Sequence, residues 1–207
     1  MDGVLVDGEP LHFEAVNHLL GEEGRSITLE AYKPYMGTKT GWRDMLADNK
    51  LAKPDAYYNE RYNNLILDQY ERASVPTPGS VELVRALERA NVPLAVASSS
   101  RKPWVEACLT RLGILDAFPI RVTGGDVQAG KPAPDIYLKA AERLGIAPNK
   151  CLAIEDAPAG IQSAKNAGMT VWAVRTEYTR DLPLPSPHRE FESLVDVQLA
   201  DIVGVAV

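Results

Sequence analysis

Cysteine is scarce in this sequence, and basic residues are outnumbered by acidic ones. The 207 residues include two cysteines, Cys108 and Cys151, and neither has the spacing of a metal ligand, so we expect two small buried thiols in a reducing compartment. Lysine and arginine number 22 against 28 acidic residues, which gives a net charge of -6. A nucleic-acid surface needs clustered positive charge, so we expect no nucleic-acid partner. A small anionic substrate is still compatible, because one lysine in a pocket can outweigh the net charge.

Long apolar runs are also missing. No stretch approaches the length that spans a membrane, and no signal-peptide pattern is found. Hydrophobic residues make up 45% and charged residues 24% of the chain, which is the composition of an ordinary globular protein able to bury a core. We therefore expect a cytoplasmic monomer with no membrane partner.

From residue 80 onward, short apolar runs alternate with helical patterns. Strands are expected at 92–97, 120–123, 151–154 and 170–174, with a last short helix at 191–198. This order predicts an α/β fold with a parallel sheet and right-handed crossovers.

Helical patterns fill the first third of the chain. Behind Pro10, apolar residues recur on one face from Leu11 to Leu20, and residues 29–70 stay helical and rich in polar side chains, without a convincing strand. We expect a helical insertion that forms a separate lid. The domain organisation expected is an α/β core of residues 1–7 and 76–207 and a helical cap of residues 8–75.

Two adjacent carboxylates, Glu155 and Asp156, end the apolar run that begins at Cys151. In parallel sheets, ligands lie beyond the carboxyl ends of the strands. An aspartate that precedes Pro158 and a helix is often only a helix cap. However, neighbouring carboxylates repel each other and a cation would relieve that repulsion. Oxygen-only ligation would suit magnesium, which usually takes one or two protein carboxylates.

Three other residues at predicted loops or strand ends carry suitable chemistry. Ser98, with the amides that follow it, could hold a phosphate, or this serine cluster could simply turn the chain. Lys131, in a proline-rich loop, could direct a positive charge at a phosphoryl group, or be a solvated surface lysine. Asp2 could act as a general acid and base, or form a local turn before Gly3.

Taken together, these segments resemble the haloacid dehalogenase-like hydrolases, in particular the phosphatases and β-phosphoglucomutases that carry a helical cap. The matching segments are Met-Asp-Gly-Val-Leu-Val-Asp at 1–7, Ala-Ser-Ser-Ser at 97–100, Gly-Lys-Pro-Ala-Pro-Asp at 130–135 and Ile-Glu-Asp-Ala-Pro-Ala-Gly-Ile at 154–161. The resemblance implies a three-layer, Rossmann-like parallel sheet core with an inserted helical cap, and magnesium as the cofactor.

The resemblance also implies roles for individual residues. Asp2 matches the general acid and base, whose backbone carbonyl also binds magnesium, and Glu155 and Asp156 match the magnesium-binding acids. Ser98 and Ser99 match the phosphate-binding segment, and Lys131 matches the lysine that neutralises the phosphoryl charge. His12 falls where the mutases have a hinge histidine, although it could also be an ordinary residue of a helix face. Substrate contacts from the cap are expected at Lys39, Thr40 and Arg61.

One departure from the family pattern concerns the nucleophile. The family's nucleophilic aspartate lies two positions before Asp2, which would be one residue ahead of Met1. That aspartate attacks phosphorus to give an aspartyl-phosphate, which water then hydrolyses. The family's first strand, central in the sheet, is missing with it, so we expect residues reading apolar-apolar-Phe-Asp upstream of Met1. A smaller departure is Gly8, where a hydroxyl residue is usual.

The expected activity is magnesium-dependent hydrolysis of the phosphate ester of a small phosphorylated metabolite, a sugar phosphate in particular. The first alternative is a β-phosphoglucomutase-like phosphosugar mutase. The second is a catalytically impaired phosphate-binding protein.

Overall fold

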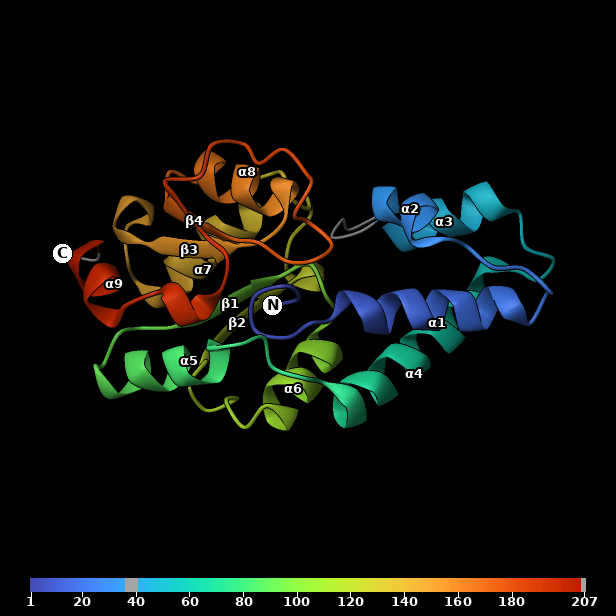
Figure 1. Ribbon diagram of the computed structural model, residues 1–207, viewed down its shortest axis with the longest axis horizontal. Coiled ribbons are helices and arrows are strands. Elements are labelled where there is room, and N and C mark those ends of the chain that lie inside the picture. Colours follow the sequence, from blue (N-terminus) through green and yellow to red (C-terminus); the bar gives the residue numbers. More distant parts are fainter. Residues whose placement is uncertain (36–40, 206–207) are drawn as a thin grey trace.

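The computed structural model describes residues 1–35 and 41–205 (Figure 1). In the described residues, four α-helices lie in the first third of the chain, and the later α-helices precede, separate or follow the strands. The helices are α1 (Glu9–Gly21), α2 (Leu29–Tyr32), α3 (Gly41–Asn49), α4 (Asp55–Ala73), α5 (Ser80–Arg89), α6 (Lys102–Arg111), α7 (Asp135–Leu144), α8 (Pro158–Asn166) and α9 (Leu199–Val205). Figure 1 shows α8 on one side of the strands and α5 and α6 on the other.

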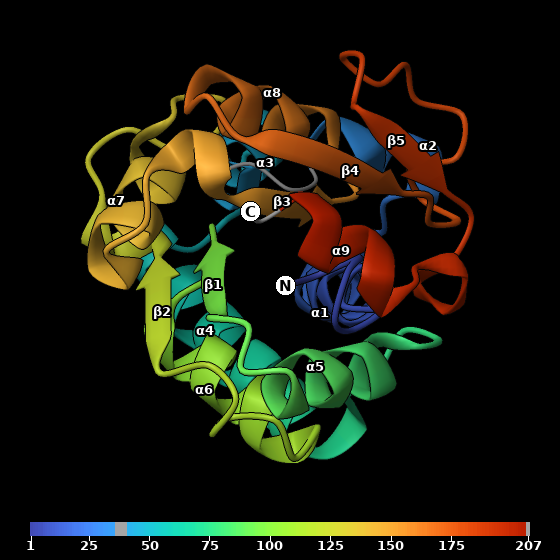
Figure 2. The same ribbon diagram turned by 90° about the vertical axis from the view of Figure 1, so that its left-hand side faces the viewer.

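The strands are parallel and hydrogen-bond in two groups. The first pairs β1 (Ala95–Ser98) with β2 (Ile120–Thr123), and the second has the order β3 (Leu152–Glu155), β4 (Thr170–Val174), β5 (Arg189–Phe191). The α/β fold and its four predicted parallel strands are confirmed. Figure 2 shows the two groups as separate, with the start of the chain between them.

The C-terminal region differs from the sequence prediction. Residues 191–198 do not form a helix: they hold the end of β5 and a 3₁₀ turn, and α9 begins only afterwards. The Ser193 hydroxyl accepts a hydrogen bond from the Val195 amide and starts this tight turn. Leu194 and Val197 are both buried against the sheet, so apolar residues three positions apart mark the turn here rather than a longer helix.

The helical segment, defined here as residues 9–73, owes its packing to one stripe of α4. Tyr58, Tyr62, Ile66 and Tyr70 follow each other at intervals of four and are all buried. This spacing places them on one face of the helix. The stripe packs in one hydrophobic cluster with the apolar face of α1, which Figure 1 shows running alongside α4. No helix in the described part of the chain is long and apolar enough to cross a membrane.

The chain starts with a tight turn against the strands. The Leu5 amide donates to the Met1 carbonyl at 2.7 Å, and the Gly3 amide donates to the Val6 carbonyl at 2.8 Å. Gly3 has a φ of 71°, which glycine adopts without the steric cost of a side chain. The Ser80 hydroxyl donates to the Leu5 carbonyl at 3.0 Å and fixes the turn to α5.

An apolar cavity of about 510 Å³ lies between the two groups of strands. Its walls include Val96 of β1 and Ala153 of β3, and the first residue, Met1, also lines it. Among the described residues, nothing pairs β1 with β3. The two strand edges that face this cavity are therefore open to a further strand.

Candidate active site

One cavity of about 300 Å³ brings together the four segments singled out in the sequence. It lies where β1 and β3 end and where the N-terminal turn meets the helical segment. Among the residues that line it are Asp2, His12, Ser98, Ser99, Lys131, Glu155 and Asp156. Residues up to 154 positions apart in sequence thus share one concave site, as expected where carboxyl ends of parallel strands meet.

Glu155 and Lys131 form a buried ion pair. The Lys131 ammonium donates to Glu155 Oε1 and, at 3.3 Å, to the Ala97 carbonyl, and the Tyr137 hydroxyl donates to the same Oε1. Both side chains of the ion pair are 8% exposed. Burial alone would raise the pKa of Glu155, but the Lys131 charge and these hydrogen bonds outweigh burial and lower it. Glu155 is therefore a fixed anion and Lys131 a fixed cation in the wall of the cavity.

The first turn of α8 packs directly on this ion pair. A Cβ atom at Gly160 would lie 2.2 Å from the Glu155 carboxylate, so no larger residue fits there without displacing it. The first turn of α8, which begins at Pro158, therefore lies against the Glu155 carboxylate. This contact explains why a glycine follows the two acids so soon in the sequence.

Asp156 has a very different environment from its neighbour. Burial, and then the charge of Glu155, raise the pKa of Asp156 to about 7. Within the described residues, no group donates a hydrogen bond to its carboxylate, which lines the same cavity and abuts Gly3. A buried acid without a donor is costly to ionise, and a bound cation would remove that cost.

The donor set fits a hard divalent cation held partly by the ligand. The described part of the chain holds no cluster of three or more His, Cys, Asp or Glu side chains arranged for a metal. Glu155 and Asp156 provide two carboxylates, and magnesium usually binds through one or two carboxylates together with water and substrate phosphate oxygens. The two acids and the open cavity beside them therefore suit magnesium better than a metal that needs a complete protein cage.

Asp2 and Ser98 are each held by hydrogen bonds. The Asp2 carboxylate accepts from the Ser100 hydroxyl, at 3.0 Å, and from the Tyr70 hydroxyl. Ser98 Oγ accepts from the Ser100 amide at 3.1 Å, as a chain-turning serine would. Within the described residues its own O–H has no acceptor, and it lines the cavity, so it can donate to a ligand oxygen as well.

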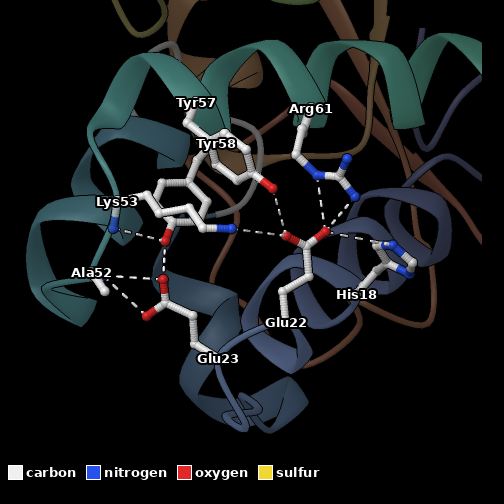
Figure 3. Close-up of polar contacts among 8 residues, drawn as sticks. All are labelled: His18, Glu22, Glu23, Ala52, Lys53, Tyr57, Tyr58 and Arg61. Atoms are coloured by element: carbon white, nitrogen blue, oxygen red, sulfur yellow. Dashed lines mark hydrogen bonds and ion pairs between the residues drawn. The ribbon is translucent and has the colours of Figure 1, made fainter.

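The four candidates from the helical segment fall in different places. His12 lines the cavity, with both ring nitrogens within 3.0 Å of tyrosine hydroxyls. Arg61 is not among the lining residues: Figure 3 shows its guanidinium on Glu22, with Nε 2.9 Å from the carboxylate. Lys39 and Thr40 lie outside the described residues.

Comparison with known proteins decides the family. Residues 1–168 match the family model of the haloacid dehalogenase-like hydrolases. The chain belongs to this family, and it is a hydrolase.

Several relatives and solved structures support this assignment. The chain is 34% identical to the fructose-1-phosphate phosphatase YqaB of Escherichia coli over 182 residues, 84% of this chain and 93% of that protein. It is 30% identical to β-phosphoglucomutase of Bacillus subtilis over 218 residues, 93% of each chain. The crystal structure of CbbY from Rhodobacter sphaeroides with phosphate superposes with a TM-score of 0.87 at 27% identity, covering 98% of this chain and 96% of that one.

One further relative is much longer than this hydrolase. The chain is 37% identical over 183 residues to Protein SUPPRESSOR OF QUENCHING 1, chloroplastic, of Arabidopsis thaliana. The matched region covers 85% of this chain but 17% of the plant protein.

Sequence patterns gave no indication of three residues at the site of this hydrolase. Tyr70 belongs to the buried stripe of α4 and reads as ordinary core. Tyr137 lies in α7 among apolar residues, and only the fold brings its hydroxyl to Glu155. Glu9 opens α1 and lines the cavity, where burial, followed by the charge of Asp2, raises its pKa to about 8. For the two tyrosines, the available sequence signal is a hydroxyl-bearing side chain at a core position of a helix. That signal does not show which residue the hydroxyl contacts.

Proposed function

We propose that this hydrolase is a magnesium-dependent phosphatase that cleaves the phosphate ester of a small phosphorylated metabolite, a sugar phosphate in particular. The observation that carries the proposal is the single cavity in which a buried lysine, a buried serine hydroxyl and three carboxylates from distant segments converge. With Glu9, Arg43 and Arg101 included, four carboxylates and three cationic side chains line this cavity. A bound cation would offset the repulsion between these carboxylates and a phosphoryl ligand. The E. coli relative named as a fructose-1-phosphate phosphatase supports a sugar phosphate as the substrate class.

In this proposal each residue has a distinct task. Lys131 and the hydroxyls of Ser98 and Ser99 bind the phosphoryl oxygens, and Lys131 neutralises part of their charge. Asp2, at the mouth of the N-terminal turn, protonates the leaving alcohol and later accepts a proton from water.

Magnesium has a defined place in the same proposal. Glu155, Asp156 and the backbone carbonyl of Asp2 would hold it, and it would supply positive charge against the phosphoryl oxygens. The raised pKa of Asp156 supports this placement, since a cation beside that carboxylate favours its ionised form.

The helical segment takes the part of a cap. We assign residues 8–75 to the cap and residues 1–7 and 76–207 to the core. Gly41, Trp42 and Asn59 of the helical segment line the cavity opposite the core residues. A cap in this position excludes water during phosphoryl transfer and admits it for the hydrolytic step. Substrate choice then depends mainly on the cap side of the cavity.

We place the nucleophilic aspartate at the end of an extended apolar segment ahead of Met1. The cavity of about 510 Å³ between β1 and β3 suits such a segment, because both strand edges are open and the walls are apolar. Met1 and Glu155 line both this cavity and the active-site cavity. A strand that leaves the apolar cavity at Met1 would therefore place a final carboxylate beside Asp2.

The test compares two chains on the same substrates. Phosphate release from fructose 1-phosphate and from 4-nitrophenyl phosphate is measured with and without magnesium, for residues 1–207 and for the chain extended upstream along its own gene. We expect magnesium-dependent release, much faster in the extended chain. The proposal fails if neither chain releases phosphate from a panel of phosphorylated sugars.

The two alternatives give different outcomes in the same experiment. A phosphosugar mutase would convert one hexose phosphate isomer into another faster than it releases phosphate. An impaired phosphate-binding protein would bind inorganic phosphate, measured by calorimetry, and turn over no ester in either form.

A further inference from the structure

The Asp2 carboxylate is held from two sides by hydroxyl groups of different parts of the molecule. Ser100, just after β1, donates to Oδ2 at 3.0 Å, and Tyr70 of α4 donates to Oδ1. Tyr70 is fully buried and lies 68 positions away in sequence. The orientation of the expected general acid therefore depends on a residue of the helical segment.

The hydrogen bonds behind Tyr70 all point in one direction. The Tyr70 oxygen lies 3.0 Å from His12 Nε2, and the Tyr62 hydroxyl lies 2.7 Å from His12 Nδ1. Because Tyr70 has one hydroxyl proton and gives it to Asp2, it must accept from His12 Nε2–H. Nδ1 then carries no proton and accepts from Tyr62. The chain of donors runs from Tyr62 through His12 and Tyr70 to Asp2.

The protonation states that this direction needs agree with the surroundings. Burial lowers the pKa of His12, and the charge of Asp2 offsets this only in part, so the ring is neutral with one N–H. A tyrosine hydroxyl is protonated at neutral pH, so Tyr70 has a proton to donate to Asp2. Aligned hydrogen bonds of this kind strengthen one another in a buried site.

Gly8 provides the space in which Asp2 meets Tyr70. A Cβ atom at Gly8 would lie 2.0 Å from Asp2 Oδ1, closer than any real contact. The backbone of Gly8 has a φ of -88°, which any residue can adopt. The space for the carboxylate, and not the backbone conformation, is thus what glycine contributes at this position.

We propose that Tyr70 is a positioning residue that orients the Asp2 carboxylate for proton transfer to the leaving alcohol, in the room left by Gly8. The inference rests on the proposed phosphatase function and gives the helical segment a direct part in its chemistry. Asp2 keeps both of its hydroxyl partners only while α4 lies against the core.

The decisive test uses two esters that differ in their need for an acid. Tyr70→Phe is assayed on fructose 1-phosphate, whose alkoxide must be protonated as it leaves, and on 4-nitrophenyl phosphate, whose phenolate leaves without a proton. We expect kcat for the sugar ester to fall about 10-fold or more, while kcat for the aryl ester falls less than about threefold and both KM values change little. An equal fall for both esters, or no fall, overturns the proposal.

Two further variants separate positioning from packing. Gly8→Ala introduces a methyl group against Asp2 Oδ1 and should give the same split between the esters. Tyr58→Phe removes a phenol from the same stripe of α4, but the Tyr58 hydroxyl bonds Glu23 at the far end of the helical segment (Figure 3). It should keep the wild-type ratio of the two rates. A split in Tyr58→Phe equal to that in Tyr70→Phe would contradict a specific role for Tyr70.

An unfolding experiment decides the inference without any turnover. Tyr70→Phe, Asp2→Ala and the double variant are unfolded in urea, and the coupling between the two sites is obtained from the cycle. We expect a coupling of about threefold or more in the unfolding equilibrium constant. Coupling within error of zero rejects the contact. If the wild-type protein cleaves neither ester but the coupling is present, the proposed function fails and the Tyr70–Asp2 contact stands.

Discussion

Two places in this hydrolase carry a pair of adjacent acidic residues, and the two pairs have opposite environments. Figure 3 shows the first pair, Glu22 and Glu23, at the end of α1. Their carboxylates are met by Arg61, Lys53, Tyr57, His18, Tyr58 and the Ala52 amide. The second pair, Glu155 and Asp156, faces the active-site cavity.

The pKa directions express the difference between the pairs. Hydrogen bonds from Tyr58 and the Ala52 amide lower the pKa of Glu23. Burial would raise the pKa of Glu22, but the hydrogen bonds from Arg61 and Tyr57 and the charges of Arg61 and Lys53 together outweigh burial and lower it. At the active site, Glu155 is stabilised as an anion but Asp156 has its pKa raised to about 7. The carboxylates of the surface pair accept hydrogen bonds within the protein, whereas among the described residues no group donates to Asp156, whose carboxylate borders the cavity. A carboxylate with a strongly raised pKa that borders a cavity is a candidate binding group.

The largest expected effect comes from removing the one buried cation of the active-site pair. Lys131→Met leaves the Glu155 carboxylate buried with only Tyr137 as donor, and should lower the free energy of unfolding by about 3–5 kcal/mol. The matched variant Arg61→Met, on the exposed pair, should cost less than about 1 kcal/mol. Urea unfolding at neutral pH measures both. Similar losses in the two variants would show that the two ion pairs do not differ in burial as described.

The next effect is a gain of stability from neutralising Asp156. Because the folded-state pKa is raised to about 7, the folded state holds a proton that the unfolded state releases near pH 4. The cost of ionising Asp156 therefore grows as the pH rises from about 4 to about 7 and is full above that. Asp156→Asn should be more stable than wild type by about 1–2 kcal/mol at pH 8 and equal near pH 4. Thermal unfolding at both pH values measures the difference.

The same variant tests the magnesium site. Millimolar magnesium should raise the melting temperature of the wild-type protein through binding to the folded state, and should do so much less in Asp156→Asn. Glu23→Gln, the corresponding change in the surface pair, should keep the full response to magnesium. A magnesium response that survives unchanged in Asp156→Asn places the cation elsewhere.

A third acid of the α/β region sharpens the comparison. The Thr123 hydroxyl and amide, with Arg143, lower the pKa of Asp126 to about 2. Because the folded-state pKa is lower than the ordinary value near 4, ionised Asp126 stabilises the folded protein above about pH 4. This stabilisation is lost as the pH falls toward 2. Since Asp126 is partly exposed, Asp126→Asn should cost roughly 1 kcal/mol at pH 7 and almost nothing at pH 2. A loss that persists at pH 2 would assign the effect to packing instead of charge.

The smallest effect is expected at the surface pair itself. Glu22→Gln removes a carboxylate whose pKa is lowered by its partners. The carboxylate therefore stabilises the folded protein above its ordinary pKa, and this stabilisation is lost in acid. We expect a loss below about 1 kcal/mol at pH 7 and no change in kcat. Amide hydrogen exchange should show faster exchange in the last turn of α1 and at the start of α4. A change in activity would mean that this end of the helical segment reaches the active site.

Local patterns were sufficient to predict the strands and the helices between them. The runs that became β1, β2, β3 and β4 are apolar, short and bounded by helix-starting prolines or glycines, all of which act within a few residues. Strand β5 was not predicted because it has three residues and two of them, Arg189 and Glu190, are exposed. Its hydrogen-bond pairing with β4 holds it in the strand conformation, which its own sequence does not favour.

The sequence by itself determined which segments line the cavity at the strand ends, because the carboxyl ends of neighbouring parallel strands lie on one edge of the sheet. It also indicated the family, through four motifs spread along the chain. Only the tertiary structure decided that Glu155 is satisfied and Asp156 is not, that Arg61 faces Glu22, and that Tyr70 holds Asp2. These outcomes depend on burial and on partners 18 to 68 positions away, and the free energy of a charge or a hydroxyl is set by such surroundings and not by its neighbours in sequence.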